Sequence, residues 1–180
     1  MNFTIPYAGF LVVAFFAVGV CSSVNADDST ESKSADQIKI ASDIPFADSA
    51  DVRDAVRNEC NLGGKLSSYI LQYGKDKDLN IVQSADNTDE QGKVLRMEIS
   101  EVHGAGGGAW SGPKAVEIEG TLFQNGKEIG TFHGSRHSGG GAFGGFKSTC
   151  AIFGRCVKAL GKDVARWLES PTMKASLGDG

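Results

Sequence analysis

The chain has little of what most enzyme and nucleic-acid-binding classes require. It has no surplus of positive charge, because 18 Lys and Arg stand against 22 Asp and Glu and give a net charge of −4 at pH 7. Nucleic-acid binding depends on cationic surfaces that neutralise phosphates, so a general nucleic-acid binder is excluded. The chain also lacks a C-x-x-C pair and a G-x-S-x-G motif, which argues against thiol-redox and α/β-hydrolase chemistry. No catalytic residue, metal ligand or cofactor is predicted from these patterns.

Long apolar runs are also scarce, and the one present lies near the amino terminus. Residues 8–20 (AGFLVVAFFAVGV) form this run, which is shorter than the roughly 20 residues that span a bilayer. Small residues follow it and end in Val24-Asn25-Ala26, the pattern of a signal-peptide cleavage site. We therefore predict a signal peptide at 1–26, a disordered polar leader at 27–36, and a periplasmic or secreted protein.

Two details of this segment bear on how the chain is exported. No Lys or Arg precedes the apolar run, so an uncleaved membrane anchor is the alternative to a signal peptide. Lipidation of Cys21 is not expected, because Val20 stands where a lipobox has Gly, Ala or Ser. Export would place the protein in an oxidising compartment without a supply of ATP.

Hydrophobic periodicity predicts one α+β domain over residues 37–171, followed by a flexible tail at 172–180. Alternation of apolar and polar residues predicts strands at 37–44, 79–83, 94–103, 114–124 and 127–137. Spacings of three and four predict helices at 51–73, weakened by Gly63-Gly64, and at 152–168. Asn125-Gly126 predicts a tight hairpin turn. We expect an antiparallel or mixed sheet of about five strands with two helices packed on one face.

A glycine-rich segment precedes the last predicted helix and imitates a phosphate-binding loop. Gly139, Gly141 and Gly144 satisfy G-x-G-x-x-G, but Phe146 stands where a phosphate loop needs glycine before its Lys147. No βαβ unit follows, so nucleotide binding is not expected. Free amides at the helix start near Lys147 leave open a site for an anionic group.

Aromatic residues in the glycine-rich loops are candidates for contact with a partner. Trp110 lies in the loop 104–112, and Phe143 and Phe146 lie in the loop 138–149. Exposed aromatics in loops often contact another protein or a lipid surface; the alternative is that they fold back onto the open face of the sheet. With the polar residues of the last strand, the predicted binding set is Trp110, His133, Arg136, His137, Phe143, Phe146 and Lys147.

Three histidines are the alternative basis for a function. His133 and His137 are four residues apart on one strand and so share a face, but they lie about 13 Å apart at ~3.3 Å per residue. That distance is too long for a shared metal ion. A metal site would need His103 or a carboxylate from the adjacent strand.

Three cysteines remain after the predicted cleavage, so one is left over if two pair. Cys150 and Cys156 are six residues apart, and on a continuous helix they would lie ~9 Å apart along the axis and on different sides. They can bond if the helix begins only near Arg155. We predict the pair Cys150–Cys156, because short loops close easily; the alternative is Cys60 bonded to one of them.

The carboxyl-terminal half resembles small exported bacterial proteins of unknown function. The resemblance lies in a final strand, a glycine linker, two cysteines and an A-L-G-x-D-[IV]-A-x-W-L helix. The helix motif is met by Ala159, Leu160, Gly161, Asp163, Val164, Ala165, Trp167 and Leu168. More distantly, the layout is similar to the amino-terminal domain of the TolB translocation protein and to lipopolysaccharide-assembly lipoproteins. The resemblance implies a binding or assembly role, and no catalytic residue carries over from it.

Together these observations predict a non-enzymatic exported protein that binds another envelope component, whether protein, lipid or glycan. The binding surface would be the open face of the sheet or the glycine loops. No cofactor, nucleotide or nucleic acid is expected. The alternative function is a small metal-binding protein or hydrolase that uses His103, His133 and His137.

Overall fold

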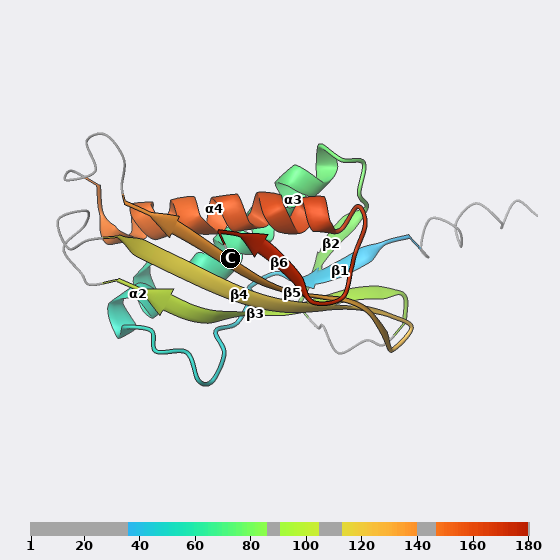
Figure 1. The fold of residues 1–180 in the computed structure, drawn as a ribbon, viewed down its shortest axis with the longest axis horizontal. Helices are drawn as coiled ribbons and strands as arrows, with labels where there is room; N and C mark the ends of the chain where they lie inside the picture. Colours follow the sequence, from blue (N-terminus) through green and yellow to red (C-terminus); the bar gives the residue numbers. More distant parts are fainter. Residues whose placement is uncertain (1–35, 86–90, 105–112, 140–146, 180) are drawn as a thin grey trace, which may run out of the picture.

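A computed structural model describes residues 36–85, 91–104, 113–139 and 147–179. The predicted signal peptide, most of the leader, and Trp110, Phe143 and Phe146 lie outside these ranges. The described residues form a six-stranded sheet with helices α3 and α4 on one face (Figure 1). The elements are β1 (Ile38–Ala41), α2 (Asp54–Glu59), α3 (Leu62–Lys75), β2 (Ile81–Ser84), β3 (Lys93–His103), β4 (Lys114–Gln124), β5 (Lys127–Ser138), α4 (Thr149–Trp167) and β6 (Ala175–Gly178).

The sheet is mixed, with strand order β2-β1-β3-β4-β5-β6. β1 runs parallel to β2 and to β3, while β3, β4 and β5 form an antiparallel meander. The turn between β4 and β5 is a two-residue hairpin: Gln124 pairs with Lys127, and Asn125 and Gly126 have φ of 51° and 77°, as a primed turn requires. The predicted α+β class is confirmed.

The predicted helix over 51–73 is divided into α2 and α3, and the division lies before the glycine pair. The chain breaks at Asn61, which adopts a left-handed φ of 46°. Gly63 lies in the first turn of α3, where a Cβ atom would stand 2.1 Å from the backbone oxygen of Ile44. Gly63 therefore permits close packing of α3 on the segment that follows β1, and it does not bend the helix.

Helix α4 forms the centre of the core. It begins after Ser148, whose side chain accepts a hydrogen bond from the Ala151 backbone N–H at 3.2 Å. Its buried side includes Ile152, Phe153, Cys156, Val157, Leu160, Val164 and Trp167. Gly161 faces α3, where a Cβ atom would lie 2.7 Å from the Cβ of Tyr69. A larger residue there would force the two helices apart. None of the helices in the described ranges is long and apolar enough to cross a membrane.

The predicted Cys150–Cys156 disulfide is wrong. Because α4 begins at Thr149, both cysteines lie on one continuous helix, where a six-residue separation forbids the bond. Cys150 is joined instead to Cys60, at the end of α2, with the two Cα atoms 4.9 Å apart. Cys156 is free and buried, and burial raises the pKa of its thiol to about 11.

The prediction of a flexible tail after Pro171 is also wrong. Residues 175–178 form β6, which pairs in parallel with β5 from Phe132↔Ala175 to Ser135↔Gly178. The backbone N–H of Asp179 donates to the oxygen of Ser135 at 2.9 Å. The residues around β6 are mostly small and polar, so they lack the alternation of apolar and polar residues that predicts a strand. The local sequence therefore does not predict the pairing of β6 with β5.

The disulfide generates the first prediction. Cys60→Ser should lower the free energy of unfolding by about 2–4 kcal/mol, because the bond closes a long loop in the unfolded chain. Urea denaturation measures the loss, and Cys156→Ala, which leaves the bond intact, should cost about 1 kcal/mol. Trypsin cuts after Arg155 and so separates Cys150 from Cys156. A non-reducing peptide map that joins those two peptides would contradict the assignment.

Candidate functional site

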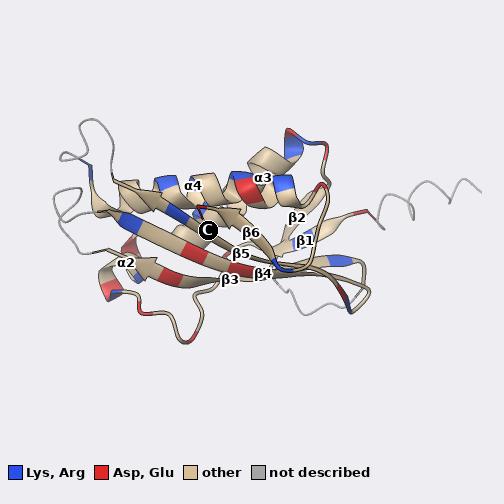
Figure 2. Cartoon of the chain, viewed as in Figure 1, with Lys and Arg blue, Asp and Glu red and all other residues tan. Residues whose placement is uncertain are grey.

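The side chains of β3, β4 and β5 that point away from α3 and α4 form a face that we call the open face. Phe132 packs edge-on against Trp167 of α4 with ring centroids 4.8 Å apart, so its strand neighbour His133 points to the other side. The strand register extends this face across the sheet. Its members are Arg96, Glu98, Glu101, His103, Glu117, Glu119, Thr121, Thr131, His133, Ser135 and His137. Figure 2 shows the acidic positions in red along β3 and β4.

A β-bulge at Ser100 determines which side chains of β3 reach this face. Ile99 pairs with Ile118, but the next pair is Glu101 with Glu117, so Ser100 is an extra residue. In a regular strand, Glu101 and His103 would point toward the helices. The inserted residue turns both onto the open face. The Ser100 hydroxyl is buried and has no hydrogen-bond partner among the described residues.

The bulge brings together four side chains that we call the Glu117 cluster: Glu101, His103, Glu117 and His133. His103 Nε2 contacts Glu101 Oε2 and lies 3.9 Å from Glu117 Oε1. The other oxygen of Glu117 lies 3.3 Å from His133 Nε2. One ligand atom each from Glu101, His103 and Glu117 lie within 4.8 Å of one another. Two imidazoles and two carboxylates from three strands therefore meet at one place.

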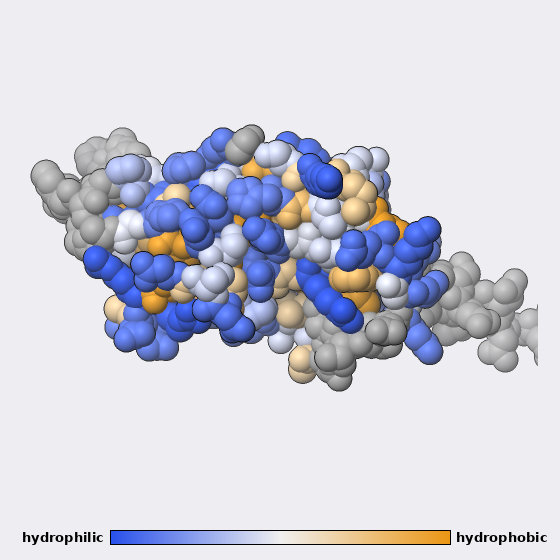
Figure 3. Space-filling view, turned by 60° about the horizontal axis from the view of Figure 1, so that its bottom comes forward, coloured by the Kyte–Doolittle hydropathy of each residue, from blue (hydrophilic) through white to orange (hydrophobic). Residues whose placement is uncertain are grey.

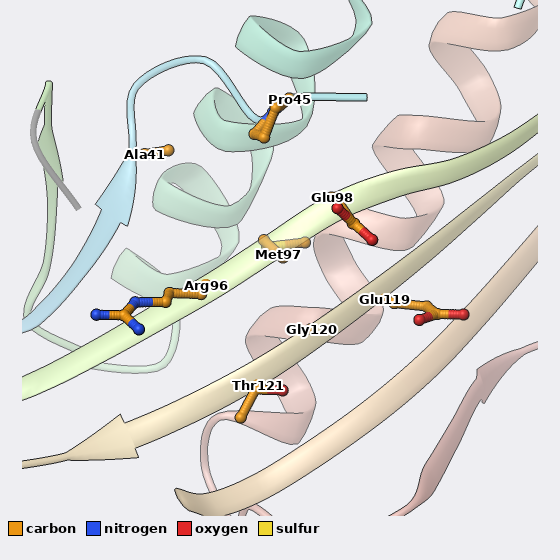
Figure 4. Close-up of a pocket in the computed structure, with 8 residues that line it drawn as sticks. All are labelled: Ala41, Pro45, Arg96, Met97, Glu98, Glu119, Gly120 and Thr121. Atoms are coloured by element: carbon orange, nitrogen blue, oxygen red, sulfur yellow. The ribbon is translucent and has the colours of Figure 1, made fainter. Parts of the chain in front are cut away.

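A hollow of about 530 Å³ occupies another part of the open face. Residues at its rim or floor are Ala41, Pro45, Arg96, Met97, Glu98, Glu119, Gly120 and Thr121 (Figure 4). In that view the helices lie behind the strands, so the hollow opens on the side away from them. Glu98 and Glu119 are direct partners across β3 and β4, which places two negative charges side by side at its rim.

Arg136, predicted as a binding residue, has a structural role. It points toward α4, where its Nε donates to Asp163 Oδ2 at 2.8 Å and its Nη1 donates to Asp179 Oδ1 at 2.6 Å. The hydrogen bond to Asp163 raises the pKa of Arg136, and the His137 backbone N–H lowers the pKa of Asp179. The side chain of Asp163 is only 7% exposed, and the ion pair with Arg136 compensates for its burial.

The other described residues of the predicted binding set do not lie together. His133 lies in the Glu117 cluster, but His137 lies beside Asp179, with Nδ1 3.5 Å from Oδ2. Lys147 lies directly before the Ser148 cap of α4. Sequence reasoning missed the carboxylates of the open face. Alternation along 114–124 does place Glu117 and Glu119 on the polar side, yet only the register shows which residues they oppose.

The helix motif behind the predicted resemblance is explained by packing. Gly161 permits contact with α3, Asp163 pairs with Arg136, and Trp167 packs on Phe132. Its indole N–H also donates to the oxygen of Thr172 at 3.3 Å, at the start of the segment that leads to β6. These motif residues hold α4 on the sheet, and none of them lies on the open face.

The chain has a distant structural resemblance to a protein of known structure. No protein-family model and no curated protein matches it. Solved structures that resemble it include a minor lipoprotein from Acinetobacter baumannii, with 9% sequence identity and a TM-score of 0.42, over 81% of this chain and 98% of that chain. The resemblance to small exported bacterial proteins stays a prediction, and function has to be inferred from the side chains of the open face.

The Arg136 network generates the second prediction. Arg136→Gln should lower the free energy of unfolding by about 2–3 kcal/mol, because it leaves a buried carboxylate without its partner. It should also speed hydrogen exchange in β6. The matched control is Arg166→Gln, which removes a 63% exposed guanidinium 3.9 Å from the same Asp163 and should be nearly neutral. Equal losses in the two variants, measured by urea denaturation, would contradict the role of Arg136.

Proposed function

We propose that the chain is an exported, non-enzymatic protein that binds a basic segment of another envelope protein on its open face. The observation that carries the proposal is the hollow of about 530 Å³ on that face, with Glu98 and Glu119 side by side at its rim. Concave surfaces with a few polar groups are the usual ligand sites of proteins. The hollow offers a partner both shape and charge.

Charge is the feature that selects the partner. Glu98 opposes Glu119 at the rim of the hollow; like charges directly opposite in a sheet are destabilising. A cationic ligand over this pair would relieve the repulsion. An anionic lipid surface would be repelled, and a neutral glycan would leave the repulsion in place, so a basic protein segment fits best.

Apolar contact has a small part in this recognition. Met173 is the one large hydrophobic side chain among the described residues that is markedly exposed, at 52%. Figure 3 turns the lower side of the molecule forward and shows mainly hydrophilic residues, with hydrophobic ones in small separate areas. Docking onto such a surface would be steered by electrostatics and weakened by salt.

Two observations support export and a binding role. The Cys60–Cys150 disulfide is typical of proteins in oxidising compartments, which agrees with the signal-peptide pattern of residues 1–26. The hollow presents two adjacent carboxylates, Glu98 and Glu119, which suit the binding of a cationic partner. We therefore propose binding at this place.

The third prediction concerns the partner. A photo-crosslinking residue at Thr121, inside the hollow, should capture a discrete envelope protein in living cells, whereas one at Lys162, on the exposed side of α4, should not. Glu98→Lys with Glu119→Lys should reduce the yield at least about tenfold, because like charges then face the basic segment.

The matched control for charge reversal is Glu59→Lys, an exposed change at the end of α2, which should leave the cross-link intact. Equal capture in the doubly reversed variant would contradict the proposal. So would a product joined to lipid or glycan, or capture only from a cross-linker placed at Lys147 beside the glycine-rich loop.

The fourth prediction concerns export. Mass spectrometry of the protein from the envelope or the medium should show a chain that begins at Asp27 and carries one disulfide and one free thiol. The free thiol, Cys156, should resist alkylation until the protein is unfolded, because it is buried and its thiolate is disfavoured. A cytoplasmic protein that retains residues 1–26 and has three reduced thiols in 27–180 would contradict export.

A further inference from the structure

We propose that the Glu117 cluster binds one divalent transition-metal ion, with Glu101, His103 and Glu117 as ligands and Zn²⁺ as the representative ion. Imidazole nitrogens and carboxylate oxygens together are the donor set of zinc and related ions. The site lies on the same face as the proposed partner site but uses different residues. It therefore stands or falls separately from the proposed function.

The geometry of the three ligand atoms fits a single ion. His103 Nε2 contacts Glu101 Oε2 and lies 3.9 Å from Glu117 Oε1, and all three atoms lie within 4.8 Å of one another. Ligands bound at about 2.0–2.2 Å from zinc lie at most ~4.4 Å apart. The side chains of His103 and Glu101 are 59% and 52% exposed. Small rotations of these two side chains can therefore bring the three ligand atoms within the distance that zinc requires.

The backbone supplies an observation that is independent of the side-chain distances. The bulge at Ser100 is what puts Glu101 and His103 on the open face, opposite Glu117. It leaves the buried hydroxyl of Ser100 without a hydrogen-bond partner among the described residues, which costs stability. Bulges of this kind are frequent next to functional sites, where they aim side chains. An ion between Glu101 and Glu117 would offset that cost by neutralising their repulsion.

His133 completes the site from the third strand. Its Nε2 lies 3.3 Å from Glu117 Oε2, while Oε1 of the same carboxylate faces His103. A group that holds the outer oxygen of a ligating carboxylate fixes its orientation and tunes its affinity. We assign His133 this positioning role. Three protein ligands leave at least one coordination position of the ion open.

A cleft beside the site gives a metal ion access to the ligands. Glu101 and His103 also line a cleft of about 330 Å³ together with Asp51, Arg53, Val102 and Gly104. A small hydrated cation can therefore reach the ligands without movement of the sheet. The open position would face this cleft and the solvent, available to water or to a side chain of a bound partner.

Calorimetric titration of Zn²⁺ into the purified chain, free of any polyhistidine tag and treated with chelator, tests the site. We expect one equivalent to bind, and millimolar Mg²⁺ not to displace it, because Mg²⁺ prefers oxygen ligands alone. His103→Ala and Glu117→Gln should each weaken binding at least tenfold. His133→Ala should weaken it about tenfold or more while stoichiometry is kept, as the loss of a positioning group does.

The matched control is His137→Ala. His137 is 58% exposed, close to the 59% of His103, and also lies on the open face, but its neighbour is Asp179. This variant should bind Zn²⁺ as the unaltered chain does. Circular dichroism would verify that each variant is folded.

Absence of stoichiometric Zn²⁺ binding would overturn the metal site, as would equal binding by folded His103→Ala. The outcome is distinct from that of the cross-linking experiment. Zinc binding without cross-linking from Thr121 would contradict the proposed partner site and support the metal site. Cross-linking from Thr121 without zinc binding would contradict the metal site and support the partner site.

Discussion

The ion pair between Arg136 and Asp163 holds together elements from three parts of the chain. Arg136 belongs to β5, Asp163 to α4, and the second carboxylate, Asp179, follows β6. A buried carboxylate is tolerated only when a cation neutralises it, so α4 must sit where its Asp163 meets β5. This placement leaves the other face of β3, β4 and β5 to the solvent, and the candidate sites lie on that face.

Local periodicity predicted the class of fold and most element bounds. The strand expected at 114–124 is observed as Lys114–Gln124, and the Asn125-Gly126 turn has the expected backbone, because both depend on neighbours in sequence. The predictions that were wrong concern contacts between residues far apart in the sequence. The disulfide partner of Cys150 is 90 residues away, and β6 is held by β5 and the Arg136 network instead of by its own residues.

The candidate sites were predictable only in part. His103 and His133 were selected from the sequence, and a carboxylate from the adjacent strand was recognised as the group a metal would need. The identity of that carboxylate, Glu117, follows from strand register and from the bulge at Ser100. Neither has a reliable signal in a single sequence, since a shift of one residue exchanges the two faces of a strand. His137, chosen on the same grounds as His133, lies apart from the cluster because it is four residues further along β5, where it pairs with Ala115 and lies beside Asp179.

The covalent link between Cys60 and Cys150 has a mechanical consequence. It encloses α3, β2, β3, β4 and β5 in a ring, while β1, α2, α4 and β6 lie outside it. A tensile force applied at the two ends of the chain is transmitted by the sulfur–sulfur bond and does not act on the elements within the ring. The segment that carries the open face is therefore protected from tension. Under load, only the elements outside the ring can be unfolded directly by the force.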